Sequence, residues 1–267
     1  MNLGIIGFGN AAQAFTKGLL ASGHMRVGSL RITERTQEKK DMAKDLFGLE
    51  AFSNNVDLAE WSDYILLAVK PINYPEVLAE IKDHLKGKVL ISFIVGTSHE
   101  ELSKHLVPGT AVVRIMPNIA MAVREALCTA WRNDQVSDEQ FETVLNMYRK
   151  VGEVLVVDEP TMEKVAAVSA AGLGFVAYWM AALEKATVAL GIDPKEAEII
   201  AVQTFKGAVH TVGETDFSPT DLQNSVATKG GTTIEGLMLM EERGVTQAIS
   251  DGVNATYQKG LSFSKKK

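Results

Sequence analysis

The sequence predicts an α/β protein in which a doubly wound parallel sheet is followed by an all-helical domain. In the first half of the chain, short and nearly uninterrupted apolar runs alternate with amphipathic stretches. This alternation is typical of a parallel sheet covered by helices on both faces. After Asp158 the strand signals stop and alanine-rich helical segments take over. We therefore expect a sheet domain over residues 1–159 and a helical domain over residues 160–267.

The apolar runs give the order of the expected strands. Five of them are strong: "LGIIG" (3–7), "LRIT" (30–33), "YILLAV" (64–69), "VLISFIV" (89–95) and "AVVRIM" (111–116). Two weaker strands are expected over 126–130 and 153–157. The amphipathic segments 11–22, 37–47, 74–84 and 137–151 are predicted to form helices between these strands.

The helical half begins with one long predicted helix, over residues 161–190, that ends at Gly191. "DPKE" (193–196) and "SPTD" (218–221) each place a capping residue before a proline and an acidic residue, which is typical of a helix start. The long helix is apolar on more than one side and must be buried on every side. Because so small a domain can hardly cover it alone, we expect a homodimer through these helices or a larger assembly; a monomeric core is the alternative.

Charge and cysteine content exclude several classes of protein. The chain has 267 residues, a net charge of -6 and a pI of about 5.5. General binders of nucleic acid or of anionic membranes are basic, so neither partner is expected. The single cysteine, Cys128, excludes an intramolecular disulfide and a cysteine zinc cluster, and no metal site is predicted. No basic n-region lies before the first strand and no apolar run approaches the ~20 residues of a membrane span, so a cytoplasmic protein is expected. The Lys265–Lys267 tail is interpreted as a solvated end.

A glycine motif, "GFGNAA" (7–12), lies between the first strand and the first helix. Gly7 would permit a tight turn, Gly9 would let the backbone approach a pyrophosphate, and Ala12 would allow close packing of helix on strand. Asn10 and Ala11 open the helix, whose N-terminus favours phosphate. Within repeated strand–helix units this motif predicts a Rossmann domain that binds NADPH or NADH, with a glycine turn that binds no ligand as the alternative.

The sequence leaves the choice between the two cofactors open. Glu34 ends the second strand, where an acid would hydrogen-bond the adenosine ribose hydroxyls and favour NAD. Arg35 and Thr36 follow directly and could hold the 2′-phosphate of NADP. Further cofactor contacts are expected after later strands, at the carboxyl edge where ligands of such sheets bind: Ala68, Val69, Lys70, Pro71, Met116 and Pro117. Asn118 is expected to reach the substrate.

A second ligand site is predicted by "KGGTT" (229–233). Gly230 and Gly231 come directly before an apolar segment that is expected to be a helix, an arrangement that suits a small anion bound by backbone N–H groups. The N–H groups of Gly231, Thr232 and Thr233 are expected to bind a substrate carboxylate, and Lys229 would add a positive charge. A turn in which Thr233 is an ordinary helix cap is the alternative.

Four motifs resemble, in order and spacing, those of the pyrroline-5-carboxylate reductase family: "GFGNAAQAF" (7–15), "LLAVKP" (66–71), "VVRIMPN" (112–118) and "ATKGGTTIEGLMLME" (227–241). The similarity extends over nearly the whole chain. It implies a Rossmann domain, a helical dimerisation domain, dimers that often assemble into rings, and reduction of 1-pyrroline-5-carboxylate to L-proline by NAD(P)H.

The residues also fit an imine better than a ketone. A carbonyl substrate needs a side chain that gives or takes a proton, and the expected face of the long helix offers neither Lys nor Asn. His105 and His210 lie outside any motif. An imine nitrogen is close to protonated at neutral pH, so a hydroxyl suffices to manage its proton. Thr233 and Thr232 are therefore the predicted catalytic residues.

The chain departs from the family pattern around the expected substrate pocket. Six positions differ: Lys229 for proline, Ile119 and Ala120 for Thr-Pro, and Ala171, Leu173 and Phe175 for serine, proline and tyrosine. These changes leave two other interpretations open. One is reduction of another cyclic imino acid, such as a pyrroline-2-carboxylate or a piperideine carboxylate. The other is a regulatory paralogue that binds a dinucleotide without turnover.

Overall fold

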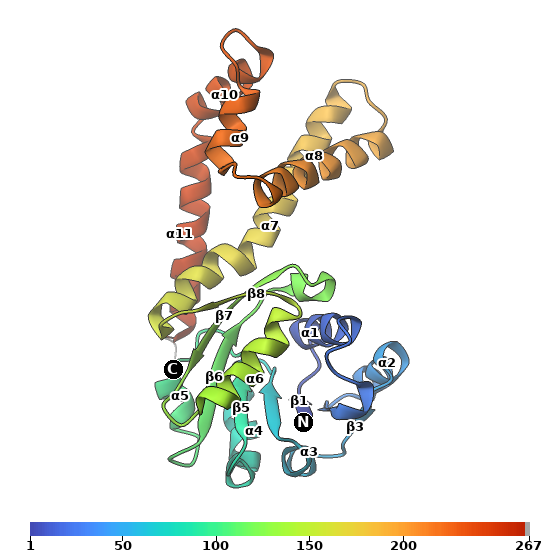
Figure 1. The fold of residues 1–267 in the computed structure, drawn as a ribbon, viewed down its shortest axis with the longest axis vertical. Coiled ribbons are helices and arrows are strands. Elements are labelled where there is room, and N and C mark those ends of the chain that lie inside the picture. The colour runs from blue at the N-terminus through green and yellow to red at the C-terminus, as the bar shows by residue number, and fades with distance from the viewer. Residues whose placement is uncertain (265–267) are drawn as a thin grey trace. The chain divides into compact units, whose positions relative to one another are not determined.

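The computed structural model describes residues 1–264, so the predicted solvated tail, Lys265–Lys267, lies outside the described residues (Figure 1). The chain divides into two compact units. Among the described residues, unit 1 comprises 1–170 and 257–264, and unit 2 comprises 171–256. The division falls inside helix α7 (Glu159–Ala189). The boundary expected between the sheet domain and the helical domain, between residues 159 and 160, stays a prediction.

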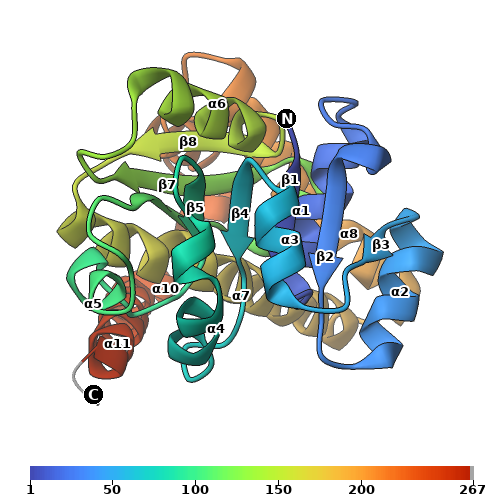
Figure 2. The same cartoon turned by 90° about the horizontal axis from the view of Figure 1, so that it is seen from below.

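Unit 1 contains an eight-stranded sheet in the order β3-β2-β1-β4-β5-β6-β7-β8. Its strands are β1 (Leu3–Ile6), β2 (Leu30–Thr33), β3 (Glu50–Ala51), β4 (Tyr64–Leu67), β5 (Val89–Ser92), β6 (Ala111–Met116), β7 (Ala126–Arg132) and β8 (Gly152–Val156). Figure 2 shows β3 with α2 at one end of the sheet and β8 with α6 at the other. The strand order reverses between β1 and β4, which is where sheets of this kind bind ligands.

Helices cover both faces of this sheet, as predicted. They are α1 (Asn10–Ala21), η1 (Val27–Ser29), α2 (Gln37–Phe47), α3 (Asn55–Trp61), α4 (Tyr74–Ile81), η2 (Lys82–His84), α5 (His99–Ser103), η3 (Ile119–Val123) and α6 (Asp138–Arg149). One buried cluster joins the sheet to α1, α2 and α6, and a second joins it to α3, α4 and α5. Alternate residues of β4 belong to opposite clusters: Leu66 to the first, Ile65 and Leu67 to the second. The near-continuous apolar runs are therefore explained by burial on both faces.

One part of the predicted parallel sheet is wrong. Strand β7 pairs with β6 in antiparallel orientation, and β8 then pairs with β7 in parallel. The reason is the connection between β6 and β7, which contains only the short helix η3 and not a crossover helix long enough to return the chain to the starting edge. The two-residue strand β3 and the helix α3 were also not predicted.

Unit 2 consists of helices: the second part of α7, then α8 (Pro194–Glu214), α9 (Pro219–Val226), α10 (Thr232–Glu242) and most of α11 (Val245–Ser264). The predicted helix starts are confirmed. Asp193 caps α8 by accepting the N–H of Lys195 at 2.9 Å, and Ser218 forms a capping box with Asp221 at the start of α9. Gly191 follows α7 with a φ of 90° and ends it.

The helices of unit 2 leave much apolar surface uncovered in a single chain. Helix α7 is long and apolar enough to cross a membrane by length and composition alone, with a mean hydropathy of 1.7 and only 6% of its most apolar 18-residue window buried. The expectation that no apolar run approaches this length is therefore wrong. Large apolar side chains also lie exposed on or beside the other helices, among them Leu190, Ile199, Val209 and Met238. Helices with such faces need a partner that covers them.

Candidate functional site

The glycine turn after β1 has the geometry predicted for it. Gly7 has a φ of 87°, and its N–H donates to the carbonyl oxygen of Thr33 at 3.0 Å. A Cβ atom here would lie 2.8 Å from Val69 Cγ1 and 2.9 Å from the Ala68 carbonyl oxygen. At Gly9, the N-cap of α1, a Cβ atom would meet nothing within 4 Å. Gly7 is therefore required by the turn itself, whereas Gly9 leaves open space in front of the helix start.

A cavity of about 490 Å³ adjoins this turn, at the carboxyl ends of β1, β2 and β4. Seven of the predicted cofactor residues line it: Gly7, Gly9, Glu34, Arg35, Ala68, Val69 and Lys70. Seven others do not: Asn10, Ala11, Ala12, Thr36, Pro71, Met116 and Pro117. Ala12 is fully buried in the core, as expected for a position that brings helix and strand together. A cavity of this size, with open space beside a helix N-terminus, fits a nicotinamide dinucleotide.

The carboxylate of Glu34, directly after β2, is hydrogen-bonded to the protein backbone. Its Oε2 accepts the N–H of Phe8 at 2.8 Å, and its Oε1 accepts the N–H of Arg35 at 2.9 Å. Lys39 Nζ lies 3.5 Å from Oε2, and the Glu34 side chain is only 9% exposed. Burial alone would raise the pKa of this carboxyl, but the two N–H groups and Lys39 hold the pKa below its ordinary value. Glu34 is therefore ionised at neutral pH and already hydrogen-bonded.

Several polar residues of this cavity were missed in the sequence. Lys39 and Lys40 reach it from α2, a few residues after Glu34, and a basic pair at that spacing was an available signal. Asn55 connects two walls of the cavity, since its Oδ1 accepts from Thr33 Oγ1 and its Nδ2 donates to Glu80 Oε2, both at 2.6 Å. No sequence pattern marked Asn55, because its partners come from β2 and α4.

Arg114 is the largest buried charge in unit 1. It is 2% exposed in the middle of β6, and it donates to Glu159 Oε1 at 2.7 Å and to Glu163 Oε1 at 3.2 Å. Glu159 Oε1 also accepts the N–H of His99 at 2.6 Å. Arg114 thus joins β6 to the first two turns of α7 and, through Glu159, to the start of α5. The sequence motif "VVRIMPN" contains this residue, but nothing in the sequence identified its partners.

Asn118 lies just after β6 and is engaged within unit 1. Its Oδ1 accepts the N–H of Ala120 at 3.0 Å, and its Nδ2 donates to the carbonyl oxygen of Ser169 at 3.2 Å. The side chain therefore caps η3 and fastens the loop to α7. Its contact with a substrate stays a prediction, as do the cofactor contacts of Met116 and Pro117.

The predicted anion site in unit 2 is a tight turn followed by a helix. Gly231 N–H donates to the Thr228 carbonyl oxygen at 3.0 Å, and Gly230 has a φ of 78°. This is the pattern of a type II turn, which favours proline at its second position and glycine at its third. Lys229 occupies the second position and is exposed. The turn explains why a proline suits this position in the family, and it shows that lysine is accepted there.

Helix α10 begins with unused hydrogen-bond donors. The N-cap of α10 is Gly231, which has no side chain that could cap the helix. The alternative in which Thr233 is the helix cap is therefore wrong. The N–H of Gly231 is taken by the turn and is not available for a ligand. Within residues 1–264, the N–H groups of Thr232 and Thr233 have no acceptor, as expected for the first turn of a helix. Both side chains are exposed.

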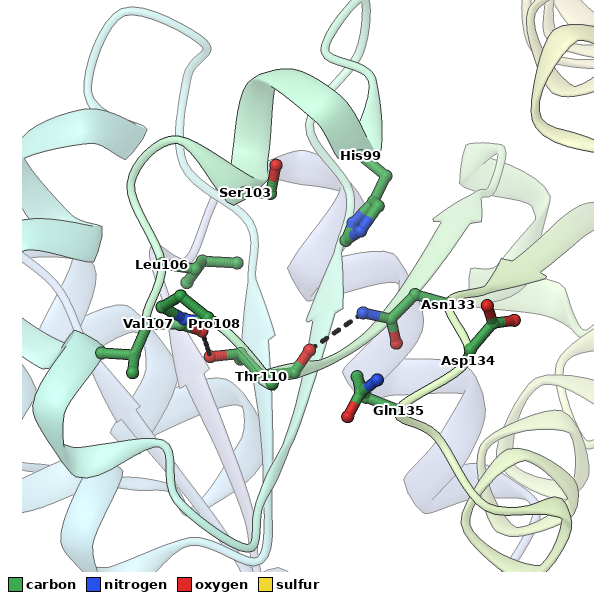
Figure 3. A pocket seen from close by; sticks show the side chains of 10 residues that line it. His99, Ser103, Leu106, Val107, Pro108, Thr110, Asn133, Asp134 and Gln135 are labelled. Atoms are coloured by element: carbon green, nitrogen blue, oxygen red, sulfur yellow. Dashed lines mark hydrogen bonds between the residues drawn. The ribbon is translucent and has the colours of Figure 1, made fainter.

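A second cavity, of about 260 Å³, contains none of the predicted site residues (Figure 3). It lies beside the loop that precedes β6, with His99 on one side and Asn133 on the other. Both ends of the Asn133 amide are hydrogen-bonded there, because its Nδ2 donates to the Thr110 carbonyl oxygen at 2.9 Å and its Oδ1 accepts the N–H of Val112 at 3.0 Å.

The cysteine and two of the histidines could in principle supply nucleophilic or acid–base chemistry, but Cys128, His105 and His210 do not line the cavity at the glycine turn. Burial raises the pKa of Cys128 to about 12, which leaves the thiol protonated and inert. His105 packs edge-on against Tyr74, and His210 Nδ1 lies 2.7 Å from Glu214 Oε1 on an exposed helix face. Among the described residues, no group of three His, Cys, Asp or Glu side chains could hold a metal ion.

Comparisons with known proteins agree with this arrangement. Residues 159–262 match the family model for pyrroline-5-carboxylate reductase dimerisation, and residues 2–96 match the model named NADP oxidoreductase coenzyme F420-dependent. The pyrroline-5-carboxylate reductase of Aquifex aeolicus is 34% identical, over 97% of this chain and 96% of the relative. That of Escherichia coli is 31% identical, over 98% of both chains.

Solved structures give the same result. The crystal structure of Plasmodium falciparum pyrroline carboxylate reductase with NADP bound has a TM-score of 0.91 to this chain and is 25% identical to it. The superposition covers 99% of this chain and 98% of that one. Given sequence identities above 30% over nearly its whole length, the chain belongs to the pyrroline-5-carboxylate reductase family.

Proposed function

We propose that this chain reduces the cyclic imine 1-pyrroline-5-carboxylate to L-proline, with NADPH or NADH as the reductant. The observation that carries the proposal is the pairing of two features in one chain: a glycine turn beside a dinucleotide-sized cavity, and a Gly-Gly-Thr-Thr helix start with free N–H groups. Membership in the reductase family supports the same activity.

Unit 1 holds the cofactor in this proposal. The open space at Gly9 admits the pyrophosphate, and the first N–H groups of α1 bind it. Ala68, Val69 and Lys70 line the path of the dinucleotide along the end of β4. The bound nicotinamide supplies the hydride. The residues predicted by sequence that do not line the cavity, such as Pro71 and Met116, remain part of the proposal as contacts of the nicotinamide end.

Unit 2 binds the substrate carboxylate. The N–H groups of Thr232 and Thr233, at the positive end of the α10 dipole, are suitable donors to an anion. Gly230 and Gly231 shape the turn so that no side chain covers these donors, and Lys229 adds a positive charge beside them. Because Gly231 N–H is used in the turn, the carboxylate donors are those of the two threonines.

Proton handling needs little from the protein. Once the imine nitrogen is protonated, hydride addition to the ring carbon breaks the C=N π bond and leaves a secondary amine, which then takes one proton to form the ammonium of proline. The Thr233 hydroxyl, with that of Thr232, is assigned to orient the nitrogen and its proton. Holding the ring in place is the main contribution, since correct positioning of two reactants is worth about 7–11 kcal/mol.

The chain works as a homo-oligomer, in agreement with the dimerisation domain over residues 159–262 and with the exposed apolar faces of α7 and α8. We include a ring of dimers in the proposal, because α10 also carries exposed apolar residues in the single chain. A cytoplasmic location is also part of the proposal and rests on the free, buried thiol of Cys128.

Oxidation of NADPH and of NADH, followed separately with three imines, tests this function. With 1-pyrroline-5-carboxylate we expect turnover and formation of proline, and with pyrroline-2-carboxylate and piperideine-2-carboxylate a much lower kcat/KM. Turnover of only one of the latter would assign a different imine. Dinucleotide binding with no turnover of any imine would mean that Ala171, Leu173 and Phe175 mark a regulatory paralogue.

A further inference from the structure

One side chain joins the loop after β6 to helix α7. Asn118 is 8% exposed, and both ends of its amide are hydrogen-bonded to backbone groups. Its Oδ1 accepts the N–H of Ala120, and its Nδ2 donates to the carbonyl oxygen of Ser169. The first partner can only donate and the second can only accept, so an amide matches both and a carboxylate does not.

The short helix η3, which Asn118 caps, is held closely against α1. Met121 of η3 is fully buried in the cluster that joins the sheet to α1. The two backbones approach so closely that a Cβ atom on Gly18 would collide with the Met121 carbonyl oxygen. The N–H of Glu125 closes the far end of η3 on the carbonyl oxygen of Ala120 at 3.1 Å. Close packing of this kind leaves η3 little freedom to shift against α1.

Asn118 therefore links α7 to the helix that begins at the glycine turn. In the proposed function the start of α1 binds the pyrophosphate of the dinucleotide. The link meets α7 at Ser169, directly before the stretch that contains Ala171, Leu173 and Phe175. These three residues are among the departures from the family pattern around the expected substrate pocket. The same side chain thus connects the cofactor helix to the part of α7 that is expected to lie near the substrate.

We propose that Asn118 contributes to the reaction as a positioning residue, by fixing α7 at Ser169 relative to α1, and not as a ligand of the substrate. This inference rests on the proposed function, because it assumes that the dinucleotide binds at the start of α1. The amide keeps a second N–H on Nδ2, so its two hydrogen bonds do not by themselves exclude a ligand role. The two roles differ in which kinetic constant they change, because a small misplacement of the reactants slows the chemical step.

Asn133 offers a matched control in the same unit. Its Oδ1 and Nδ2 also join a backbone N–H to a backbone carbonyl oxygen, those of Val112 and Thr110, at 3.0 and 2.9 Å. It does not line the cavity at the glycine turn. Asn118→Asp and Asn133→Asp therefore make the same chemical change, a carboxylate oxygen against a carbonyl oxygen, in two places. Asn118→Ser is a milder variant, since serine is a good helix cap but is too short to reach α7.

Steady-state kinetics give the first measurement. We expect both Asn118 variants to lower kcat for 1-pyrroline-5-carboxylate about ten- to a hundredfold, with the KM of the imine and the Kd of the dinucleotide within about twofold of the wild type. Asn133→Asp should lower Tm as Asn118→Asp does, yet leave all three constants unchanged. The loss of kcat should be as large with 1-pyrroline, because a positioning residue does not depend on the substrate carboxylate.

Hydrogen–deuterium exchange tests the link without any turnover. Loss of the hydrogen bond from Asn118 to Ser169 should speed amide exchange in α7 over residues 165–175. We expect this in both Asn118 variants and not in Asn133→Asp. The result does not depend on whether the protein reduces an imine, so failure of the proposed function and failure of this inference are distinguishable.

Three results would overturn the proposal. The first is a kcat in both Asn118 variants that equals that of Asn133→Asp. The second is a higher KM for 1-pyrroline-5-carboxylate with no change for 1-pyrroline, which would make Asn118 a ligand of the substrate carboxylate. The third is wild-type exchange in α7 in both Asn118 variants. A wild-type protein that turns over no imine, with faster exchange in the Asn118 variants, would contradict the proposed function and leave the link between η3 and α7 standing.

Discussion

Replacing Arg114 with methionine is expected to lower the free energy of unfolding by about 3–5 kcal/mol, the usual cost of removing one partner of a buried ion pair. The guanidinium is 2% exposed and bonds two carboxylates, Glu159 and Glu163, that are themselves 23% and 18% exposed. Methionine keeps most of the volume of the side chain but leaves both carboxylates without their cation. Because Glu163 and Glu159 open α7, the start of that helix should loosen first.

Urea denaturation of the wild type and of two arginine variants measures this effect. Arg149→Ala is the matched control, since Arg149 pairs with Glu142 on the exposed face of α6 and such pairs contribute about 0–1 kcal/mol. Adding Glu159→Gln and Glu163→Gln to Arg114→Met should restore part of the loss, because no unpaired charge then remains. A loss no larger than that of the control would show that the Arg114 network does not stabilise unit 1.

Gly7→Ala should impair both folding and dinucleotide binding, whereas Gly9→Ala should impair binding alone. At Gly7 the added Cβ would lie 2.9 Å from a backbone oxygen, and the φ of 87° adds about 1–2 kcal/mol of strain for a residue with a side chain. At Gly9 the Cβ enters open space, so the cost to stability should stay below about 1 kcal/mol. That same Cβ would occupy the space expected for the pyrophosphate.

Thermal melting and NADPH titration distinguish these two glycines. We expect a lower Tm for Gly7→Ala only, and an affinity for NADPH reduced about tenfold or more, equivalent to at least about 1.4 kcal/mol, for both variants. If Gly9→Ala bound NADPH like the wild type, the pyrophosphate could not lie against the start of α1. Equal Tm values for both variants would contradict the turn geometry at Gly7.

Much of the fold is predictable because it depends on local patterns. Burial on both faces produces the apolar runs of β4 to β6, and caps such as Ser137, which forms a capping box with Gln140, mark helix starts in the sequence itself. The orientation of β7 is different. It depends on how the chain packs after a short connection, and no residue between Pro117 and Glu125 reveals it. The strand β3 has two residues and is too short to give a pattern.

In the candidate site, too, local features are predictable from the sequence and tertiary contacts are not. The glycine turn and the type II turn before α10 are local, so Gly7 and Gly230 could be identified from the sequence alone. The partners of a charged side chain are set by tertiary structure. The contact of Glu34 with the N–H of Phe8, 26 residues away, cannot be derived from the sequence around Glu34. The same holds for Arg114, whose partners lie 45 and 49 residues further along the chain.

The departures from the family pattern have unequal explanations. Lys229 fits the second position of its turn, because that position tolerates residues other than proline. Ile119 and Ala120 begin η3, which Asn118 caps. For Ala171, Leu173 and Phe175 nothing in the structure explains the change.

Binding of the substrate carboxylate at the start of α10 is tested by the ratio of kcat/KM for 1-pyrroline-5-carboxylate to that for 1-pyrroline, which has the same imine ring without the carboxylate. If the N–H groups of Thr232 and Thr233 bind the carboxylate, the ratio should be about ten to a hundred, as expected for hydrogen bonds to a charged group. Equal values for the two rings would show that the start of α10 does not bind the substrate.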